Sequence, residues 1–288
     1  MNRKKQHNRR SLRYFSVLLI MIMVFCSMGM SCEYLGGQDD PNGYPDPGDD
    51  IDSEFSSFYY YEPEKESRYQ AYAEEKPKLS ADEVVWRVNA EIDNKAYKNS
   101  IESSAPETIT ALVGKHINLP KDYEPDDLVD IDRTKMRKDA AAALEVLKEA
   151  AAKEELTIIA QSGYRSFSRQ KELYEAYSKD DPKGADKYSA KPGYSEHQTG
   201  LAVDVNYDDV GNRDFVGTKE AKWVLKNSWK YGFIVRYTDD NRKITGYESE
   251  PWHLRYIGKD NSERMHNEGF ESFEEYWVKF VRTMPPDA

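Results

Sequence analysis

Two short motifs contain the side chains of this chain that are best suited to chemistry. The first is SEHQTGLAVD at residues 195–204, and the second is EPWH at residues 250–253. Together they offer two imidazoles, from His197 and His253, and the carboxylate of Asp204 as ligands for one metal ion. Three protein ligands leave a fourth position open for water, which a hydrolytic zinc site needs because that water becomes the nucleophile. The two motifs therefore predict a metallopeptidase.

The separation of His197 and Asp204 sets a condition on the local structure. Side chains of a regular strand alternate between its two faces, so the odd separation of these residues would place them on opposite faces. A shared metal therefore requires His197 to lie on the loop before the strand, with Gly200 permitting the bend. His253 must come from another element. Sets of two histidines and one carboxylate also occur in non-haem iron oxygenases, so zinc is the favoured ion and iron the alternative.

Glu250 and Arg165 fit the remaining chemistry of peptide hydrolysis. Glu250 lies three residues before His253. It is therefore near enough to accept a proton from the attacking water and pass it to the leaving amine. The alternative for Glu250 is a surface carboxylate in a turn. Arg165 follows a glycine in a turn between a strand and a helix, where its planar guanidinium could hold the scissile carbonyl oxygen or an anionic substrate group. A structural ion pair is its alternative role.

Three more side chains are weaker candidates for the substrate site. Ser195 and Gln170 could form hydrogen bonds with the terminal carboxylate or the peptide group of a substrate. Trp252, with the preceding proline, could stiffen and wall the site. The SRQK sequence at residues 168–171 also matches the S-x-x-K pattern of serine peptidases, but the S-D-N and K-T-G partners of that pattern are missing. A serine mechanism is therefore disfavoured.

The bulk composition bounds the class of protein. The 288 residues allow one sizeable domain with appendages or two small domains. The net charge of -11 argues against nucleic acid as a partner, because phosphate binding requires clustered Lys and Arg. Nothing in the composition indicates an oligomer, and a monomer is favoured.

The first residues have the pattern of an export signal. A basic stretch over residues 3–13 precedes an apolar run over residues 14–30, which is typical of a secretory signal or of an uncleaved membrane anchor. Cys32 follows a small-residue cluster that resembles a bacterial lipobox, and the other cysteine, Cys26, lies inside the apolar run. We expect residues 1–32 to form a signal peptide and Cys32 to be lipidated, with a signal anchor as the alternative. Either tether would place the protein outside the cytoplasmic membrane and hold it there, facing the cell wall.

Residues 33–80 are rich in Asp, Gly, Pro, Ser, Glu and Tyr and have almost no aliphatic residues. Such a segment buries too little apolar surface to offset its ordering entropy, so we expect an acidic, flexible linker. Folded character begins near Ala81, and residues 81–288 are expected to form the catalytic domain.

Hydrophobic spacing in that domain predicts helices interleaved with short strands. The helices are expected at residues 133–154, 166–177, 218–231 and 273–281, and the strands at residues 156–160, 203–205, 233–237 and 252–257. No regular alternation of strand and helix is present. The fold class is therefore α+β.

Three segments of the chain resemble a known family. Residues 162–166 (SGYRS), 195–205 and 250–258 are similar to the VanY-like D-alanyl-D-alanine carboxypeptidases, a zinc peptidase group that also contains the LdcB-type L,D-carboxypeptidases. The likeness covers roughly residues 82–285. It implies the fold shared with the hedgehog signalling domain, a small antiparallel sheet flanked by helices. It also implies that the zinc ligands are His197, Asp204 and His253. By the same resemblance, Glu250 is the catalytic base and Arg165 binds the substrate.

The resemblance implies an enzyme that removes the C-terminal D-alanine from peptidoglycan stem peptides with Zn²⁺ as cofactor. Two alternatives stay open. The same zinc chemistry could convert tetrapeptide to tripeptide stems as an L,D-carboxypeptidase, because the ligand motifs do not set the shape of the pocket. The fold could also serve as a non-catalytic, zinc-containing wall-binding module, against which the presence of Glu250 speaks.

Overall fold

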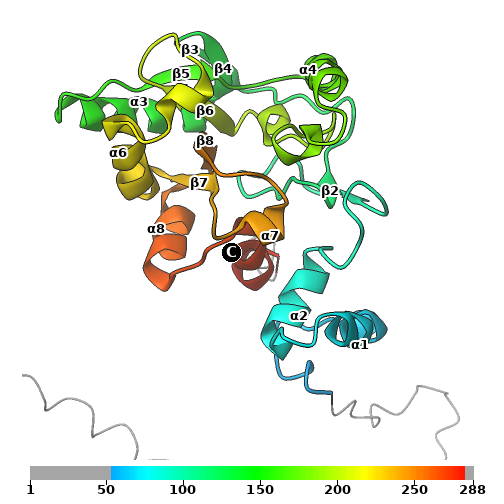
Figure 1. Cartoon of the computed structure of the whole chain (residues 1–288). Coiled ribbons are helices and arrows are strands. Elements are labelled where there is room, and N and C mark those ends of the chain that lie inside the picture. The colour runs from blue at the N-terminus through cyan, green and yellow to red at the C-terminus, as the bar shows by residue number, and fades with distance from the viewer. Residues whose placement is uncertain (1–52, 283–288) are drawn as a thin grey trace, which may run out of the picture. The chain divides into compact units, whose positions relative to one another are not determined.

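The computed structural model describes residues 53–282, which Figure 1 shows as a ribbon. The predicted signal segment, with Cys32, lies outside the described residues, as does the predicted linker up to residue 52. Within residues 53–282, no helix combines the length and the apolar character needed to cross a membrane. The described part of the chain contains both motifs that are predicted to carry the chemistry.

A four-stranded antiparallel sheet forms the centre of the fold (Figure 1). In spatial order its strands are β5 (Ile159–Ser162), β6 (Ala202–Asn206), β8 (Glu250–Tyr256) and β7 (Phe233–Tyr237). Alternate side chains of β6 point to opposite faces, so Val203 and Val205 share one face and Asp204 lies on the other. Both valines belong to the main hydrophobic core, which leaves Asp204 on the face away from that core. The predicted α+β class, with a small antiparallel sheet flanked by helices, is confirmed.

Two helices contribute to the hydrophobic core against this sheet, α3 (Lys138–Ala152) and α6 (Lys219–Asn227). The buried stripe of α3 has helical spacing and consists of Ala140, Leu144, Leu147 and Ala151. The helix α6 begins at the predicted cap Thr218, whose hydroxyl accepts a hydrogen bond from the backbone N–H of Ala221 at 3.0 Å. The packing on this face holds β6 and β8 in a fixed position.

Several element boundaries differ from the sequence-based prediction, and cross-strand pairing explains two of these differences. The helix expected from residue 133 begins at Lys138, because β4 (Thr134–Arg137) pairs with β3 (Leu128–Ile131) as an antiparallel hairpin. The strand expected over residues 156–160 lies at β5, further along the chain. In both places the cross-strand hydrogen bonds decide the boundary, and hydrophobic periodicity does not reveal them.

The N-terminal part of the described chain forms a helical pair, α1 (Glu66–Glu75) and α2 (Ala81–Asn89). The flexible linker predicted for residues 33–80 is therefore wrong for residues 53–80. The buried side chains of this part are mainly aromatic, and they include Phe55, Tyr60, Tyr69, Tyr72 and Trp86. Aromatic rings bury large areas, so they form a small core where aliphatic residues are scarce.

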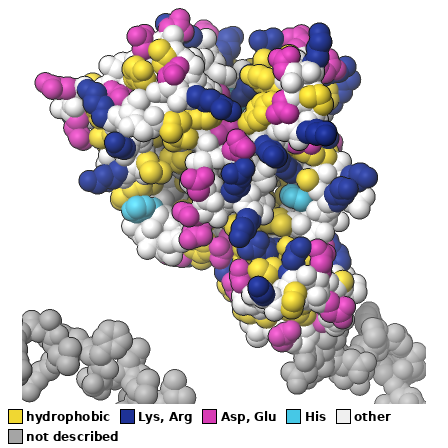
Figure 2. All heavy atoms as spheres, viewed as in Figure 1, with side chains coloured by type: hydrophobic (Ala, Val, Ile, Leu, Met, Phe, Trp, Pro, Cys, Tyr) yellow, Lys and Arg dark blue, Asp and Glu magenta, His cyan; other side chains and the backbone are white. Residues whose placement is uncertain are grey.

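The remaining described elements lie outside the four-stranded sheet. They are η1 (Pro63–Lys65), β1 (Ile101–Glu102), β2 (Ile117–Asn118), α4 (Phe167–Asp180), η2 (Ala185–Lys187), η3 (Glu196–Thr199), α5 (Asn212–Phe215), η4 (Ser228–Tyr231), α7 (Arg242–Thr245), α8 (Lys259–Glu268), α9 (Phe273–Tyr276) and the π-helical turn η5 (Trp277–Val281). On the face shown in Figure 2, positive and negative side chains are interspersed over the surface. Electrostatics at the candidate site therefore depend on the groups nearest to it.

Candidate metal centre

The structure brings His197, Asp204 and His253 together. Each offers one ligand atom, and these three atoms all lie within 4.8 Å of one another. The Nε2 of His197 is 3.4 Å from Oδ1 of Asp204, and the Nδ1 of His253 is 3.1 Å from the same oxygen. All three side chains are buried. Two imidazole nitrogens and one carboxylate oxygen in this arrangement could hold a divalent metal and leave a further position open.

The sheet register and one glycine produce this convergence. Asp204 of β6 is paired directly with His253 of β8, which places the two side chains beside each other on one face of the sheet. His197 comes from the short helix η3, ahead of the strand, as the sequence analysis required. The helix ends at Gly200, whose φ of 68° lies in the left-handed region that a glycine adopts without strain. The predicted bend at Gly200 is confirmed.

Hydrogen bonds outside the ligand set orient both imidazole rings. The Nδ1 of His197 lies 2.7 Å from the carbonyl oxygen of Gly163, and because a carbonyl only accepts, this nitrogen carries the proton. The Nε2 of His253 lies 3.2 Å from a carboxylate oxygen of Glu196 and must likewise donate. His197 Nε2 and His253 Nδ1 are therefore the ring nitrogens turned toward Asp204, and each would offer its lone pair to a metal bound there.

The titration of the three groups reflects their burial and their mutual contacts. Burial acts to raise the pKa of Asp204, but the charges and hydrogen bonds of His197 and His253 hold that pKa well below its usual range. Burial, with Arg165 nearby, lowers the pKa of His197 to about 4. Burial also acts to lower the pKa of His253, but hydrogen bonds with Asp204 and Glu196 raise it to about 9. An ionised carboxylate between two imidazoles supplies the charge and the lone pairs that a divalent cation needs.

Glu250 lies beside the ligands without belonging to their group. It is the first residue of β8, and its Oε2 is 4.0 Å from Nδ1 of His253. Burial raises the pKa of Glu250 to about 7, against the opposing effect of His253. A carboxylate whose pKa lies near neutral pH is suited to accept a proton and later release it. This position would allow Glu250 to act as a general base next to a bound metal.

Arg165 places a mostly buried cation next to the same group. Its Nη1 donates to Oε1 of Gln170 at 3.2 Å, and its Nη2 is 3.7 Å from Oδ2 of Asp204. Its Nε is buried and has no hydrogen-bond partner. The Nε2 of Gln170 in turn donates to the carbonyl of Ala190 at 2.7 Å, which fixes the amide that holds the guanidinium. Arg165 also lines the cavity, so its guanidinium could bind an anionic or carbonyl group of a ligand.

One cavity of about 960 Å³ connects these groups. Every site residue predicted within the described chain lines it: Arg165, Gln170, Ser195, His197, Asp204, Glu250, Trp252 and His253. Ser168 and Lys171 of the S-x-x-K pattern do not line this cavity, and both side chains are exposed. The geometry therefore gives the serine mechanism no support.

Several lining residues were missed by the sequence analysis. Four tyrosines from separate segments contribute to the wall, namely Tyr177, Tyr188, Tyr237 and Tyr247. The ring of Tyr237 is 4.9 Å from the ring of His253, measured between centroids. No sequence motif marks these tyrosines, because the fold assembles them from distant parts of the chain. Glu196 was also missed, although its position next to His197 was a signal.

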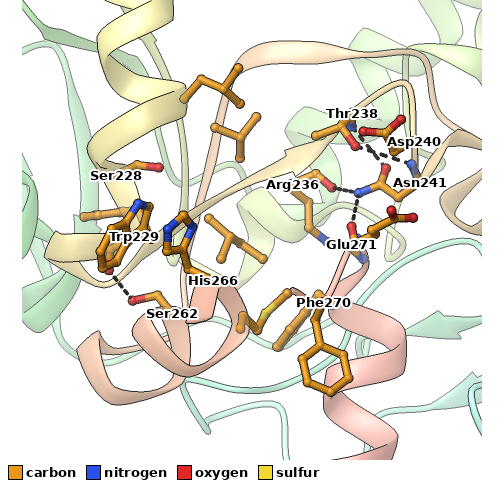
Figure 3. A pocket seen from close by; sticks show the side chains of 16 residues that line it. Ser228, Trp229, Arg236, Thr238, Asp240, Asn241, Ser262, His266, Phe270 and Glu271 are labelled. Atoms are coloured by element: carbon orange, nitrogen blue, oxygen red, sulfur yellow. Dashed lines mark hydrogen bonds between the residues drawn. The ribbon is translucent and has the colours of Figure 1, made fainter. Parts of the chain in front are cut away.

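A second cavity, of about 370 Å³, has no lining residue in common with the first (Figure 3). Its wall includes Trp229 and His266, whose rings stack with centroids 3.9 Å apart. Within residues 53–282, the group formed by His197, Asp204 and His253 is the one that could hold a metal, and none of these residues lines the second cavity. The larger cavity is therefore the candidate active site.

Comparison with known proteins agrees with this geometry. The family model of VanY, D-alanyl-D-alanine carboxypeptidase, matches residues 133–259, a range that contains both motifs. YodJ of Bacillus subtilis (strain 168) is 43% identical over 188 residues, which cover 60% of this chain and 68% of that relative.

Two solved structures are also similar. The LdcB LD-carboxypeptidase is 40% identical with a TM-score of 0.58, over 64% of this chain and 92% of that one. A mutant of the vancomycin resistance D,D-pentapeptidase VanY, solved in complex with Zn(II), is 32% identical with a TM-score of 0.51, over 58% of this chain and 97% of that one. From its sequence and its fold, this chain belongs to the VanY family of carboxypeptidases.

Proposed function

We propose that this protein is a zinc-dependent carboxypeptidase that removes the C-terminal D-alanine from peptidoglycan stem peptides. The observation that carries the proposal is the convergence of the ligand group, Glu250 and Arg165 on one cavity in a member of the VanY family. The Zn(II) complex of a similar structure supports the choice of metal, and the donor set of two imidazoles and one carboxylate fits zinc.

The roles of the residues follow from their positions. Zinc held by His197 Nε2, a carboxylate oxygen of Asp204 and His253 Nδ1 would polarise the scissile carbonyl and lower the pKa of water. Glu250 accepts a proton from the water that attacks the carbonyl carbon. It then delivers that proton to the amine nitrogen as the C–N bond breaks. The products are a peptide shortened by one residue and free D-alanine.

Arg165 is assigned to the C-terminal carboxylate of the substrate. A carboxypeptidase must recognise that charge. Arg165 lines the cavity, and its Nη2 lies 3.7 Å from Oδ2 of Asp204, so its guanidinium is close to the ligand group. Gln170 holds the guanidinium, while Ser195 and Trp252 line the same cavity. With its terminal carboxylate on Arg165, the substrate would have its last peptide bond next to Glu250 and the proposed metal ligands.

A second candidate is the L,D-carboxypeptidase reaction on tetrapeptide stems. It is supported by the likeness to the LdcB structure, whose identity to this chain is higher than that of the VanY structure. The two reactions use the same zinc chemistry and differ in the residue before the scissile bond. A non-catalytic wall-binding module remains the third reading.

The proposed location is the outer side of the cytoplasmic membrane. The basic and apolar pattern of residues 1–32 supports export, and Cys32 supports lipidation, with a signal anchor as the other tether. The substrate lies outside the membrane, so a membrane-held enzyme would meet it there. Labelling the protein with a radioactive fatty acid in cells, with Cys32→Ser as control, tests the lipid tether; equal labelling of both forms would contradict it.

The deciding experiment is mass spectrometry of the purified full-length protein incubated with stem pentapeptide and tetrapeptide, with and without a chelator. Loss of one alanine from the pentapeptide alone, abolished by the chelator and restored by zinc, is the expected result. Conversion of tetrapeptide to tripeptide would move the protein to the L,D class. If the zinc-loaded protein changes neither peptide, the peptidase proposal fails and the wall-binding module takes its place.

A further inference from the structure

We propose that Glu196 is a positioning residue of the metal site: its buried carboxylate holds His253 with the proton on Nε2 and the Nδ1 lone pair turned toward the metal. The inference rests on the proposed function, because it presumes that His197, Asp204 and His253 bind a metal. It adds a residue outside the ligand set that determines how well the metal is held.

The contacts of Glu196 give its carboxylate one orientation. Its Oε2 lies 3.2 Å from Nε2 of His253. Its Oε1 accepts hydrogen bonds from Nε of Arg236 at 2.8 Å and from Nη1 of Arg255 at 3.1 Å. The side chain of Glu196 is 0% exposed, so water does not compete for either oxygen. One oxygen is thus fixed by the arginines and the other is directed at the imidazole.

Both arginines are themselves anchored. Arg236 donates to both carboxylate oxygens of Glu274, at 2.6 and 3.1 Å. Arg255 donates through Nη2 to two backbone carbonyls, those of Ile109 at 3.1 Å and Ala111 at 2.8 Å. The orientation of Glu196 is therefore supported from two separate parts of the chain, Glu274 and the segment at residues 109–111.

The backbone of Arg236 is fixed as well. The Nδ2 of Asn241 donates to the carbonyl oxygen of Arg236 at 3.1 Å and to that of Glu271 at 3.0 Å, as Figure 3 shows. Arg236 and Arg255 together balance the charges of Glu196 and Glu274. A carboxylate that is fully buried but balanced in this way can remain charged beside an imidazole.

The charge of Glu196 matters because it acts on a metal ligand. A carboxylate that accepts the second N–H of a ligating histidine fixes the tautomer and the ring orientation, and it makes the other nitrogen a better donor to the metal. The two histidines differ in this respect, since Nδ1 of His197 donates to the neutral carbonyl of Gly163. Glu196 therefore acts on His253 alone and does so with a full negative charge.

If Glu196 only stabilised the fold, Glu274 would be expected to have the same role. Glu274 bonds the same arginine from the other side, is also buried, and has no hydrogen bond with His253 among the contacts of the described residues. The variants Glu196→Gln and Glu274→Gln each remove one buried charge from the same network without changing the side-chain size. In this matched pair, only Glu196→Gln changes a hydrogen-bond partner of His253.

The first test measures the zinc affinity of the full-length protein by competition with a chromophoric chelator. Glu196→Gln should weaken zinc binding about 10- to 100-fold, the usual effect of removing such an outer partner. Glu274→Gln should stay within about twofold of wild type, even where both variants lower the Tm. Equal affinity of Glu196→Gln and wild type would overturn the inference, and so would equal losses in the two variants.

The second test does not depend on the folding of a variant. In zinc-loaded wild-type protein labelled with ¹⁵N-histidine, His253 should show a proton on Nε2 that is shifted downfield and protected from exchange with water. A rapidly exchanging Nε2 proton, or a proton on Nδ1, would overturn the inference. If wild type itself binds no zinc, the proposed function fails too, whereas zinc binding that is unchanged in Glu196→Gln removes only the role of Glu196.

Discussion

At the scale of single residues, the surroundings of Asp204 and Glu250 shift the pKa values of these two carboxyl groups in opposite directions. The contacts of His197 and His253 hold the pKa of Asp204 well below its usual range, whereas burial raises the pKa of Glu250 to about 7. Two carboxyl groups whose pKa values are pushed apart in this way are suited to different tasks. The ionised Asp204 suits metal ligation, and Glu250 suits proton transfer.

The role of Glu250 predicts a loss of rate without a loss of metal. Glu250→Gln should keep zinc and lower kcat by about 10²- to 10⁴-fold, the usual contribution of a general base. Steady-state release of alanine and elemental analysis of the same sample measure both quantities. Glu268→Gln is the control, since its exposed carboxylate pairs with Arg264 at 2.8 Å and does not line the cavity, so it should matter little. Near-normal turnover by Glu250→Gln would refute the assignment.

The role of His253 predicts a loss of the metal itself. His253→Ala removes one of the three proposed ligands, so zinc should no longer co-purify with the full-length protein. The matched control is His266→Ala, because His266 is exposed and stacks on Trp229 outside the metal group. Elemental analysis gives the zinc content of each variant. Full occupancy in His253→Ala would contradict the ligand assignment.

The role of Arg165 predicts a weaker hold on the substrate's terminal charge. Arg165→Lys replaces a planar fork by a point charge that cannot keep both the bond to Gln170 and a contact with a carboxylate. The value of kcat/KM should fall about 10- to 100-fold, as for the loss of a charge-assisted hydrogen bond. Arg169→Lys, at an exposed position paired with Glu172, should be close to wild type. Equal kinetics of the two variants would argue against carboxylate recognition by Arg165.

At the scale of elements, β6 joins the core to the site. Its alternation sends Val203 and Val205 into the core and Asp204 toward the ligands. A shift of one residue in its pairing would exchange the two faces, burying the carboxylate in the core. The turn at Gly200, which delivers His197 and then begins β6, therefore has to keep one conformation.

Gly200→Ala should test that turn against Gly217→Ala. Both glycines have positive φ, 68° and 79°, so alanine costs about 1–2 kcal/mol of stability at either position. An added Cβ at Gly217 would meet nothing within 4 Å, whereas at Gly200 it would lie 2.9 Å from Arg137 Cγ and from Leu128 Cδ2. Urea denaturation should show a further loss of about 1–3 kcal/mol for Gly200→Ala. Equal losses would mean that the turn relaxes freely.

At the scale of the whole molecule, the two ends of the described chain pack together. Val278 of the turn η5 belongs to the same hydrophobic cluster as Tyr69 and Trp86 of the N-terminal helical pair. Arg282 adds an ion pair with Glu62, at 2.6 Å. The helical pair is therefore part of the folded unit and should contribute to its stability.

Trp86→Ala tests this integration. Trp86 is 2% exposed, and its removal should lower the free energy of unfolding by about 3–5 kcal/mol, as for other buried aromatic residues. Val146→Ala, at a position 54% exposed on α3, should change it by less than about 0.5 kcal/mol. Thermal and urea unfolding of both variants give the comparison. An unchanged Tm for Trp86→Ala would mean that residues 53–92 unfold separately from the catalytic part.

The tertiary structure changed the prediction most where local composition was misleading. Residues 53–80 have few aliphatic side chains, which predicted a linker, yet their tyrosines bury against Trp86 and against Val278 from the other end of the chain. The predicted strand over residues 233–237 coincides with β7, because its apolar run and the flanking turn residues are local signals. The β3–β4 hairpin was missed because its pairing is not visible in hydrophobic spacing.

The sequence by itself determined the types of the candidate ligands, the class of metal that they favour and the need for a bend at Gly200. These depend on side-chain chemistry and on the alternation of side chains along a strand. The family resemblance followed from the same motifs. Only the tertiary structure decided the pairing of Asp204 with His253, the nitrogen that each imidazole turns toward the metal group, and the contact of Glu196 with His253. These features depend on hydrogen bonds between segments that are distant in sequence, and the folded chain alone brings such segments into contact.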